Sequence, residues 1–150
     1  MLYLGLRLVH IAAMAAWFAP IVFVAGDARR TIEAGGDLAG LRVRMGRGGA
    51  MAAGSGIVTV LTGVALIFAM GGFGAVPVPI HIGLTLGVVM WLFGAIGIGG
   101  TVRKLDAAIA AGSSKDQLLP FARRLSMLTG IFHLLWLTIL ALMVFRNVLM

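Results

Sequence analysis

Cysteine is absent from the 150 residues of the chain, which excludes disulfide bonds and thiolate metal sites. Acidic residues are scarce, with five Asp and Glu against twelve Lys and Arg. None of these charged side chains falls in the stretches 8–26, 48–102 and 125–145. Proton-coupled transporters usually carry carboxylates inside the membrane, so this absence argues against a conventional transporter of that class.

Recognisable catalytic motifs are missing as well. The sequence contains no glycine-rich phosphate loop, no HExxH zinc motif and no credible pair of nucleophile and base. Catalytic residues therefore stay unassigned, and whether the chain is an enzyme is left open.

Apolar residues make up 61% of the chain, and only 11% of its residues are charged. A membrane-spanning helix needs about 20 mostly apolar residues, so the stretch 48–102 has room for two such helices with a turn between them. The sequence predicts an all-α integral membrane protein, a four-transmembrane-helix bundle that forms one membrane domain over residues 1–150. We place the helices at about 2–26, 47–70, 78–102 and 123–147, and the uncharged link GGFGAVPVP suits a tight turn.

Basic residues are concentrated in the two longer loops. Ten of the twelve Lys and Arg lie there, and the exceptions are Arg7 and Arg146. The positive-inside rule predicts that both loops face the cytoplasm and that both termini lie outside the inner (plasma) membrane. The ten residues are Arg29, Arg30, Arg42, Arg44, Arg47, Arg103, Lys104, Lys115, Arg123 and Arg124.

This distribution also decides what the net charge of +7 means. Most of this charge lies in loops at the membrane surface. The expected partner is therefore the lipid bilayer, and no nucleic-acid partner is expected. The first apolar run is longer than the apolar core of a signal peptide and is expected to remain as an anchor. We expect the two basic segments, 27–47 and 103–124, to lie along the membrane surface. The second is expected to contain a helix that extends out of the membrane, a Gly-Ser break and a re-entry near Pro120.

The two halves of the chain resemble each other weakly. VHIAAMAAWF and IHIGLTLGVVMWLF each begin with an apolar residue, histidine and isoleucine, and each ends on aromatic residues. Parallel two-helix repeats are related by an axis along the membrane normal. Under this interpretation His10 and His81 are equivalent.

Three histidines, His10, His81 and His133, lie one each in the first, third and fourth predicted helices. Neutral imidazole is a good ligand for haem iron, copper or zinc, and four-helix bundles build cofactor sites from facing helices. The alternative is that each histidine only forms a hydrogen bond between helices. His10 and His133 are expected to differ by only about 5 Å in their depth within the membrane, which favours them as a ligand pair. The weak repeat instead favours the pair of His10 and His81.

Arg7 and Met14 flank His10 on one helical face, at spacings of three and four residues. Haem b carries two propionates, and an arginine one turn from an axial histidine can pair with them. The alternative is that Arg7 extends its guanidinium to the membrane surface. Met14 is a candidate soft ligand for iron or Cu(I), or else a packing residue.

The segment LRLVHIAAMAAWFAPIVFV resembles the opening helix of the HemJ-type protoporphyrinogen oxidases and the related CopD-like membrane proteins. In these families a Lys/Arg–x–x–His motif is followed by Trp-Phe, and Arg7, His10, Trp17 and Phe18 match that pattern.

A second similarity lies in PIHIGLTLGVVM, where His81 matches the histidine of the HemJ pattern. The lysine two residues later in that pattern is replaced here by Gly83. The resemblance implies a small helical membrane protein that binds haem b, with His10 as the leading ligand. A HemJ-type protein would oxidise protoporphyrinogen IX, whereas a CopD-like protein would handle copper through His10 and Met14.

We therefore expect a redox-type membrane protein that binds haem b or a related porphyrin. Two alternatives remain open at this stage. One is a copper transport or resistance protein, and the other is a cofactor-free structural subunit of a larger membrane complex. A homo-oligomer or a larger membrane complex is among the expected assemblies.

Overall fold

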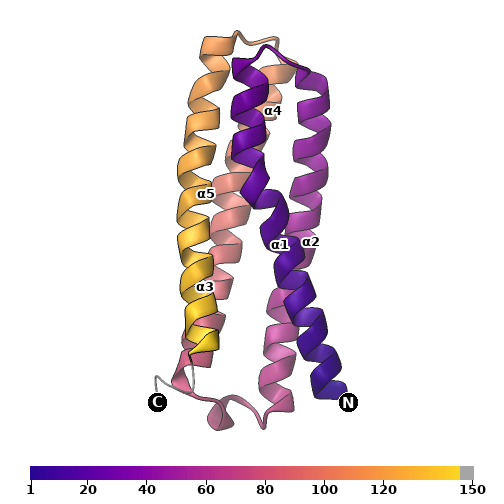
Figure 1. Ribbon diagram of the computed structural model, residues 1–150, viewed down its shortest axis with the longest axis vertical. Helices are drawn as coiled ribbons and strands as arrows, with labels where there is room; N and C mark the ends of the chain where they lie inside the picture. The colour runs from indigo at the N-terminus through magenta and orange to yellow at the C-terminus, as the bar shows by residue number, and fades with distance from the viewer. Residues whose placement is uncertain (146–150) are drawn as a thin grey trace.

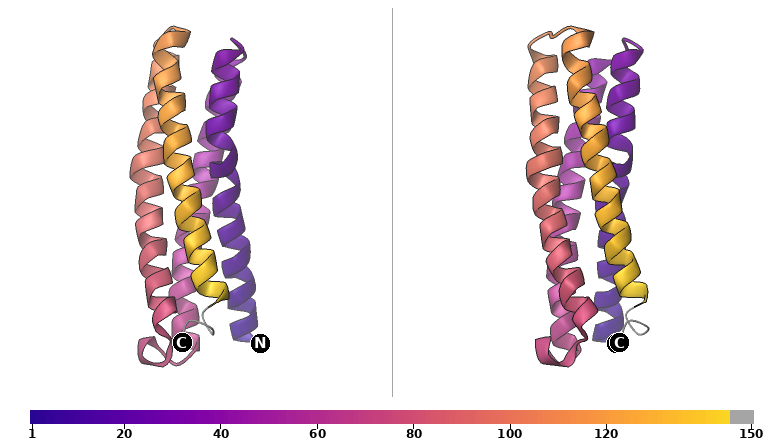
Figure 2. Two further views of the ribbon diagram at one scale, coloured as in Figure 1. Left: turned by 60° about the vertical axis from the view of Figure 1, so that its left-hand side comes forward. Right: turned by 90° about the vertical axis from the view of Figure 1, so that its left-hand side faces the viewer.

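Four long helices form an elongated bundle in the computed structural model, which describes residues 1–145 (Figures 1 and 2). Each is long and apolar enough to cross a membrane. The prediction of an all-α, four-helix integral membrane protein is therefore confirmed. The elements are α1 (Leu2–Glu33), α2 (Leu38–Ala69), a 3₁₀ turn η1 (Phe73–Ala75), α3 (Val78–Phe93), a π-helical turn η2 (Gly94–Ile98), α4 (Gly99–Ala110) and α5 (Lys115–Val144).

The third long helix is continuous from Val78 to Ala110 and consists of α3, η2 and α4. The N-terminus and the link between α2 and α3 lie at one end of the bundle (Figure 1). The links from α1 to α2 and from α4 to α5 lie at the other, which we call the basic end because all ten loop cations are near it. The two basic clusters predicted from the sequence therefore lie on the same side of the bundle.

The helices extend further at the basic end than the sequence predicted. The first predicted helix ended near residue 26, but α1 continues to Glu33 and α2 already begins at Leu38. Helices of 32 residues are roughly 48 Å long, whereas the hydrocarbon core of a bilayer is about 30 Å thick. The expectation that 27–47 lies along the membrane surface is therefore wrong, since this segment continues two spanning helices beyond the apolar layer.

In the second basic segment, the predicted helical extension beyond residue 102 is confirmed, since α4 runs to Ala110. The predicted Gly-Ser break lies between α4 and α5, at residues 112–114. The last helix was predicted to begin near 123, but α5 begins at Lys115. Pro120 lies inside α5 instead of at a re-entry point. The predicted end of the last helix, near 147, lies outside the described residues.

Local signals end and restart the helices at the basic end. Gly35 and Gly112 adopt φ values of 63° and 73° directly after α1 and α4, a backbone conformation that glycine adopts without strain and that commonly ends helices. Asp37 then caps α2 by accepting a hydrogen bond from the Gly40 N–H at 2.9 Å. Ser114 begins α5 with a capping box.

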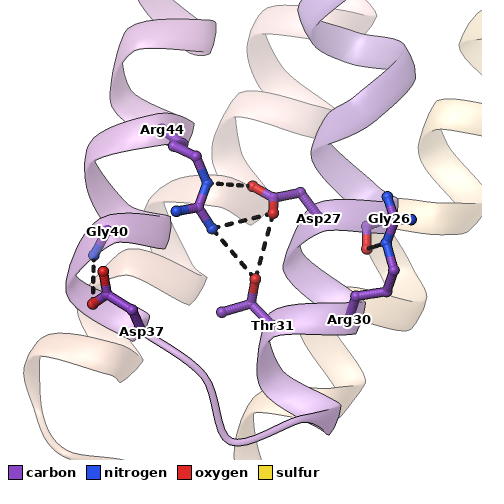
Figure 3. A network of polar contacts seen from close by, with 7 residues as sticks. All are labelled: Gly26, Asp27, Arg30, Thr31, Asp37, Gly40 and Arg44. Carbon is purple, nitrogen blue, oxygen red and sulfur yellow. Dashed lines mark hydrogen bonds and ion pairs between the residues drawn. The ribbon is translucent and has the colours of Figure 1, made fainter.

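Charged side chains join neighbouring helices at this end. Arg44 of α2 donates two hydrogen bonds to Asp27 of α1, from Nε at 2.8 Å and from Nη2 at 3.1 Å (Figure 3). Arg42 makes a similar two-point contact with Asp106 of α4, at 2.7 and 3.2 Å. Exposed ion pairs contribute little stability each, so their main effect is to fix which helices are adjacent.

The middle of the bundle is closed by aromatic packing. Trp17 of α1 is buried and meets the buried ring of Phe132 edge to face, with ring centroids 5.7 Å apart. Gly56 of α2 lets the helices approach closely here, because a Cβ on it would lie 2.7 Å from Trp91 Cδ1 and 3.1 Å from Trp17 Cε2. Pro20 lies three residues beyond Trp17 inside α1, and α1 changes direction near its middle (Figure 1), as expected where proline removes a backbone hydrogen bond.

The contact at Gly56 leads to a stability prediction. The substitution Gly56→Ala should destabilise the protein by roughly 1–3 kcal/mol, because an added methyl group overpacks the two tryptophans. Thermal unfolding in detergent micelles measures the effect. Gly54→Ala is the matched control, since a Cβ at Gly54 would meet no atom within 4 Å. Equal unfolding temperatures for the two variants would contradict this packing argument.

Candidate functional site

A cavity of about 560 Å³ lies between the four long helices, in the half of the bundle that holds the N-terminus. Side chains from α1, α2, α3 and α5 line it, and most of them are apolar. Its volume falls within the range of sites for small molecules and cofactors. The predicted site residues Arg7, His10 and Met14 all line this cavity.

The imidazole of His10 is held in one orientation by α2. Its Nδ1 lies 3.0 Å from the Thr59 carbonyl oxygen and 3.0 Å from Thr62 Oγ1. A carbonyl oxygen only accepts hydrogen bonds, so Nδ1 carries the hydrogen and donates it. The lone pair of the neutral ring is then on Nε2, which has no hydrogen-bond partner within residues 1–145.

This arrangement combines the two interpretations of His10. The hydrogen bond between helices, which a purely structural histidine would make, is present. Metal-binding histidines usually make a hydrogen bond of the same kind, in which one ring nitrogen donates to a carbonyl or carboxylate oxygen and the other nitrogen binds the metal. Gly63 of α2 provides the room, because a Cβ there would lie 3.3 Å from His10 Cε1.

Arg7 lies one helical turn from His10 toward the N-terminal end and is exposed. It forms no ion pair within the described part of the chain. Its guanidinium is therefore available to an anionic group at the edge of the cavity.

Methionine contributes more to the cavity than the sequence revealed. Four of the nine methionines line it: Met14 and, from the other helices, Met70, Met90 and Met143. The Met143 methyl group occupies the position that a Cβ on Gly83 would need. A thioether thus fills the space at the residue where the HemJ pattern has lysine.

His81 and His133 do not line this cavity. His81 lies beside the link from α2 to α3, with Nε2 3.0 Å from the Phe73 carbonyl oxygen and Nδ1 3.3 Å from that of Pro77. His10 and His81 therefore have different surroundings.

His133 packs beside Phe18, with ring centroids 5.2 Å apart. Phe18 lies eight residues beyond His10, or roughly 12 Å along the helix, so His133 is further from His10 in depth than the predicted 5 Å. Its Nε2 is buried without a hydrogen-bond partner within residues 1–145. No group of three His, Asp or Glu side chains that could hold a metal ion occurs within these residues.

Comparisons with known proteins identify no family. No protein-family model, no curated protein and no solved structure matches the chain. The resemblance to the HemJ-type and CopD-like families therefore depends on the two short stretches around His10 and His81.

Proposed function

We propose that this membrane protein binds haem b in the cavity around His10, where His10 Nε2 would hold the haem iron. The observation that carries the proposal is the hydrogen bond from His10 Nδ1 to the Thr59 carbonyl oxygen, 3.0 Å long. It fixes the ring and leaves the metal-binding nitrogen unpartnered beside a cavity between the helices. Bound haem would supply one-electron redox chemistry.

The size of the cavity supports haem over a bare metal ion. A metal ion needs several donor atoms close together, whereas a cavity of about 560 Å³ suits a larger, mostly apolar molecule. Trp136 also lines it, and its ring stacks on that of Phe18 with centroids 4.3 Å apart.

Charge and ligand chemistry point the same way. Arg7 at the edge of the cavity suits a propionate through charge-assisted hydrogen bonds. Met90 of α3 and Met143 of α5 also line the cavity, and a thioether is a known ligand of haem iron. With Gly83 in place of lysine, the chain supports a haem-binding redox role more than the specific oxidation of protoporphyrinogen IX.

One observation favours copper as a second candidate. His10 and the four cavity methionines form a set of imidazole and thioether donors with no carboxylate among the lining residues. Such soft donors select Cu(I). Under this alternative the protein would bind or transfer copper, as the CopD-like resemblance implies.

Titration of the detergent-purified protein separates these candidates. If haem b is the cofactor, added haemin should bind at one equivalent and give a sharp Soret band distinct from that of free haemin. If copper is the ligand, the protein should stay colourless and retain one or more Cu(I) ions after dialysis. Failure to bind either would leave the third alternative, a cofactor-free subunit of a membrane complex.

The clustering of ten loop cations at the basic end leads us to propose that this end faces the cytoplasm. The haem cavity would then open near the outer surface. Alkaline phosphatase fused to the C-terminus should be active, and green fluorescent protein in the same place should be dark. The same reporters inserted after Gly112 should give the reverse pattern, and a fluorescent C-terminal fusion would overturn the proposed orientation.

A further inference from the structure

A second cavity, of about 720 Å³, lies in the half of the bundle nearer the basic end. It is bounded by α1, α2 and the η2–α4 part of the third long helix. Trp17 lines both cavities, so its buried side chain separates this cavity from the one around His10. The two cavities share no other lining residue within residues 1–145.

The walls of this second cavity are built from unusually small side chains. On α2 they include Gly46 and Gly49, where an added Cβ would meet no atom within 4 Å. On the facing helix they include Gly94 and Ala95 of the π-helical turn η2. π-Helical turns inside α-helices are frequent at functional sites. The result is an open apolar space within the bundle rather than a packed helix contact.

The end of the cavity toward the basic end is cationic. Arg30, Arg44 and Arg103 line it, with Asp27 as the one carboxylate among the lining residues. Asp27 is already bound by Arg44, as Figure 3 shows. Arg30 donates a hydrogen bond from Nε to the Gly26 carbonyl oxygen, at 3.2 Å. Within residues 1–145, neither Arg30 nor Arg103 pairs with a carboxylate.

From this combination we infer that the second cavity binds one anionic phospholipid from the adjacent leaflet. The phosphate would lie at Arg30 and Arg103, and an acyl chain would occupy the space along Gly46 and Gly49. Basic pockets between transmembrane helices are suited to anionic lipid headgroups. Three arginines and one carboxylate leave a surplus of two positive charges, which a zwitterionic headgroup does not neutralise. The acyl chain of a lipid can bury its surface against the apolar walls, whereas a free anion has no apolar part to bury there. The walls therefore favour a lipid over a free anion.

Native mass spectrometry of the full chain in detergent tests the inference. Titration with dioleoyl phosphatidylglycerol should give one tightly bound lipid, and phosphatidylcholine with the same chains should bind several-fold more weakly. Gly49→Leu should abolish the tight binding by filling the cavity. Gly54→Leu on the same helix is the matched control, because Gly54 also has open space around it but lines neither cavity.

A second pair of variants tests the charge. Arg30→Gln and Arg103→Gln should each weaken the binding of phosphatidylglycerol roughly fivefold. This factor corresponds to the attraction of about 1 kcal/mol between one basic residue and an anionic lipid surface. Arg47→Gln removes the same charge from the same end of the bundle but does not line the cavity, so it should have little effect. Equal binding of the two lipids, retained binding in folded Gly49→Leu, or equal loss in Arg47→Gln would each overturn the inference. Displacement by inorganic phosphate would also overturn it, in favour of a free-anion site.

Discussion

Replacing His10 with alanine is expected to reduce haem affinity by more than roughly 100-fold, since loss of an outer partner of a metal ligand alone costs about 10–100-fold. All three histidines lie within residues 1–145, and of these His10 alone lines the cavity. Its Nδ1–H already donates to the Thr59 carbonyl oxygen. The side chain therefore presents a single nitrogen to a metal. The measurement is a haemin titration followed at the Soret band.

His81→Ala and His133→Ala are the matched controls, and both should bind haem like the wild type. His81 contacts backbone carbonyls beside the link from α2 to α3, and His133 packs against Phe18 away from the cavity. Imidazole added to His10→Gly should restore the wild-type spectrum, because it can occupy the space left by the side chain. An unchanged spectrum in His10→Ala, or equal loss in His133→Ala, would exclude His10 as the ligand.

The sequence was most informative about the membrane spans and about the face of α1. Uncharged stretches of about 20 residues identify spanning helices because charge is costly in hydrocarbon. Helical spacing places Arg7, His10 and Met14 on one face, and all three line the same cavity. Both predictions depend on local periodicity and composition, which a single sequence contains.

Features that depend on how helices are rotated against one another were not predictable in this way. Met70, Met90 and Met143 line the cavity, but apolar helices offer methionines on all faces and hydropathy does not say which face is inside. Helix ends were missed for a different reason. A hydropathy window ends where charge begins, whereas the helix itself continues until a residue such as Gly35 or Gly112 ends it.

The cation clusters illustrate the same limit. The sequence assigned Arg30 and Arg103 to surface loops, where each would be a solvated charge. In the structure both lie on helices, and both line one cavity. Their place in its wall depends on how α1, α2 and the third long helix are arranged around the cavity, which no local pattern contains.

Substitution of Gly63 with leucine is expected to lower haem affinity by roughly 5- to 150-fold, although the ligand itself is still present. A Cβ on Gly63 would lie 3.3 Å from His10 Cε1, so an isobutyl group must displace the imidazole and enter the cavity that Gly63 lines. Overpacking of this kind costs roughly 1–3 kcal/mol. Gly63→Ala should have a smaller effect, because the ring needs to move by only a few tenths of an ångström.

The two cavities allow a reciprocal control for this prediction. Gly63→Leu fills the cavity around His10 and should retain the bound phosphatidylglycerol, whereas Gly49→Leu fills the other cavity and should retain haem. General unfolding would instead remove both ligands from one variant. Haemin titration and native mass spectrometry on the same preparations measure both. If Gly63→Leu binds haem with wild-type affinity, the haem does not bind beside His10, because the cavity next to that ring has been filled.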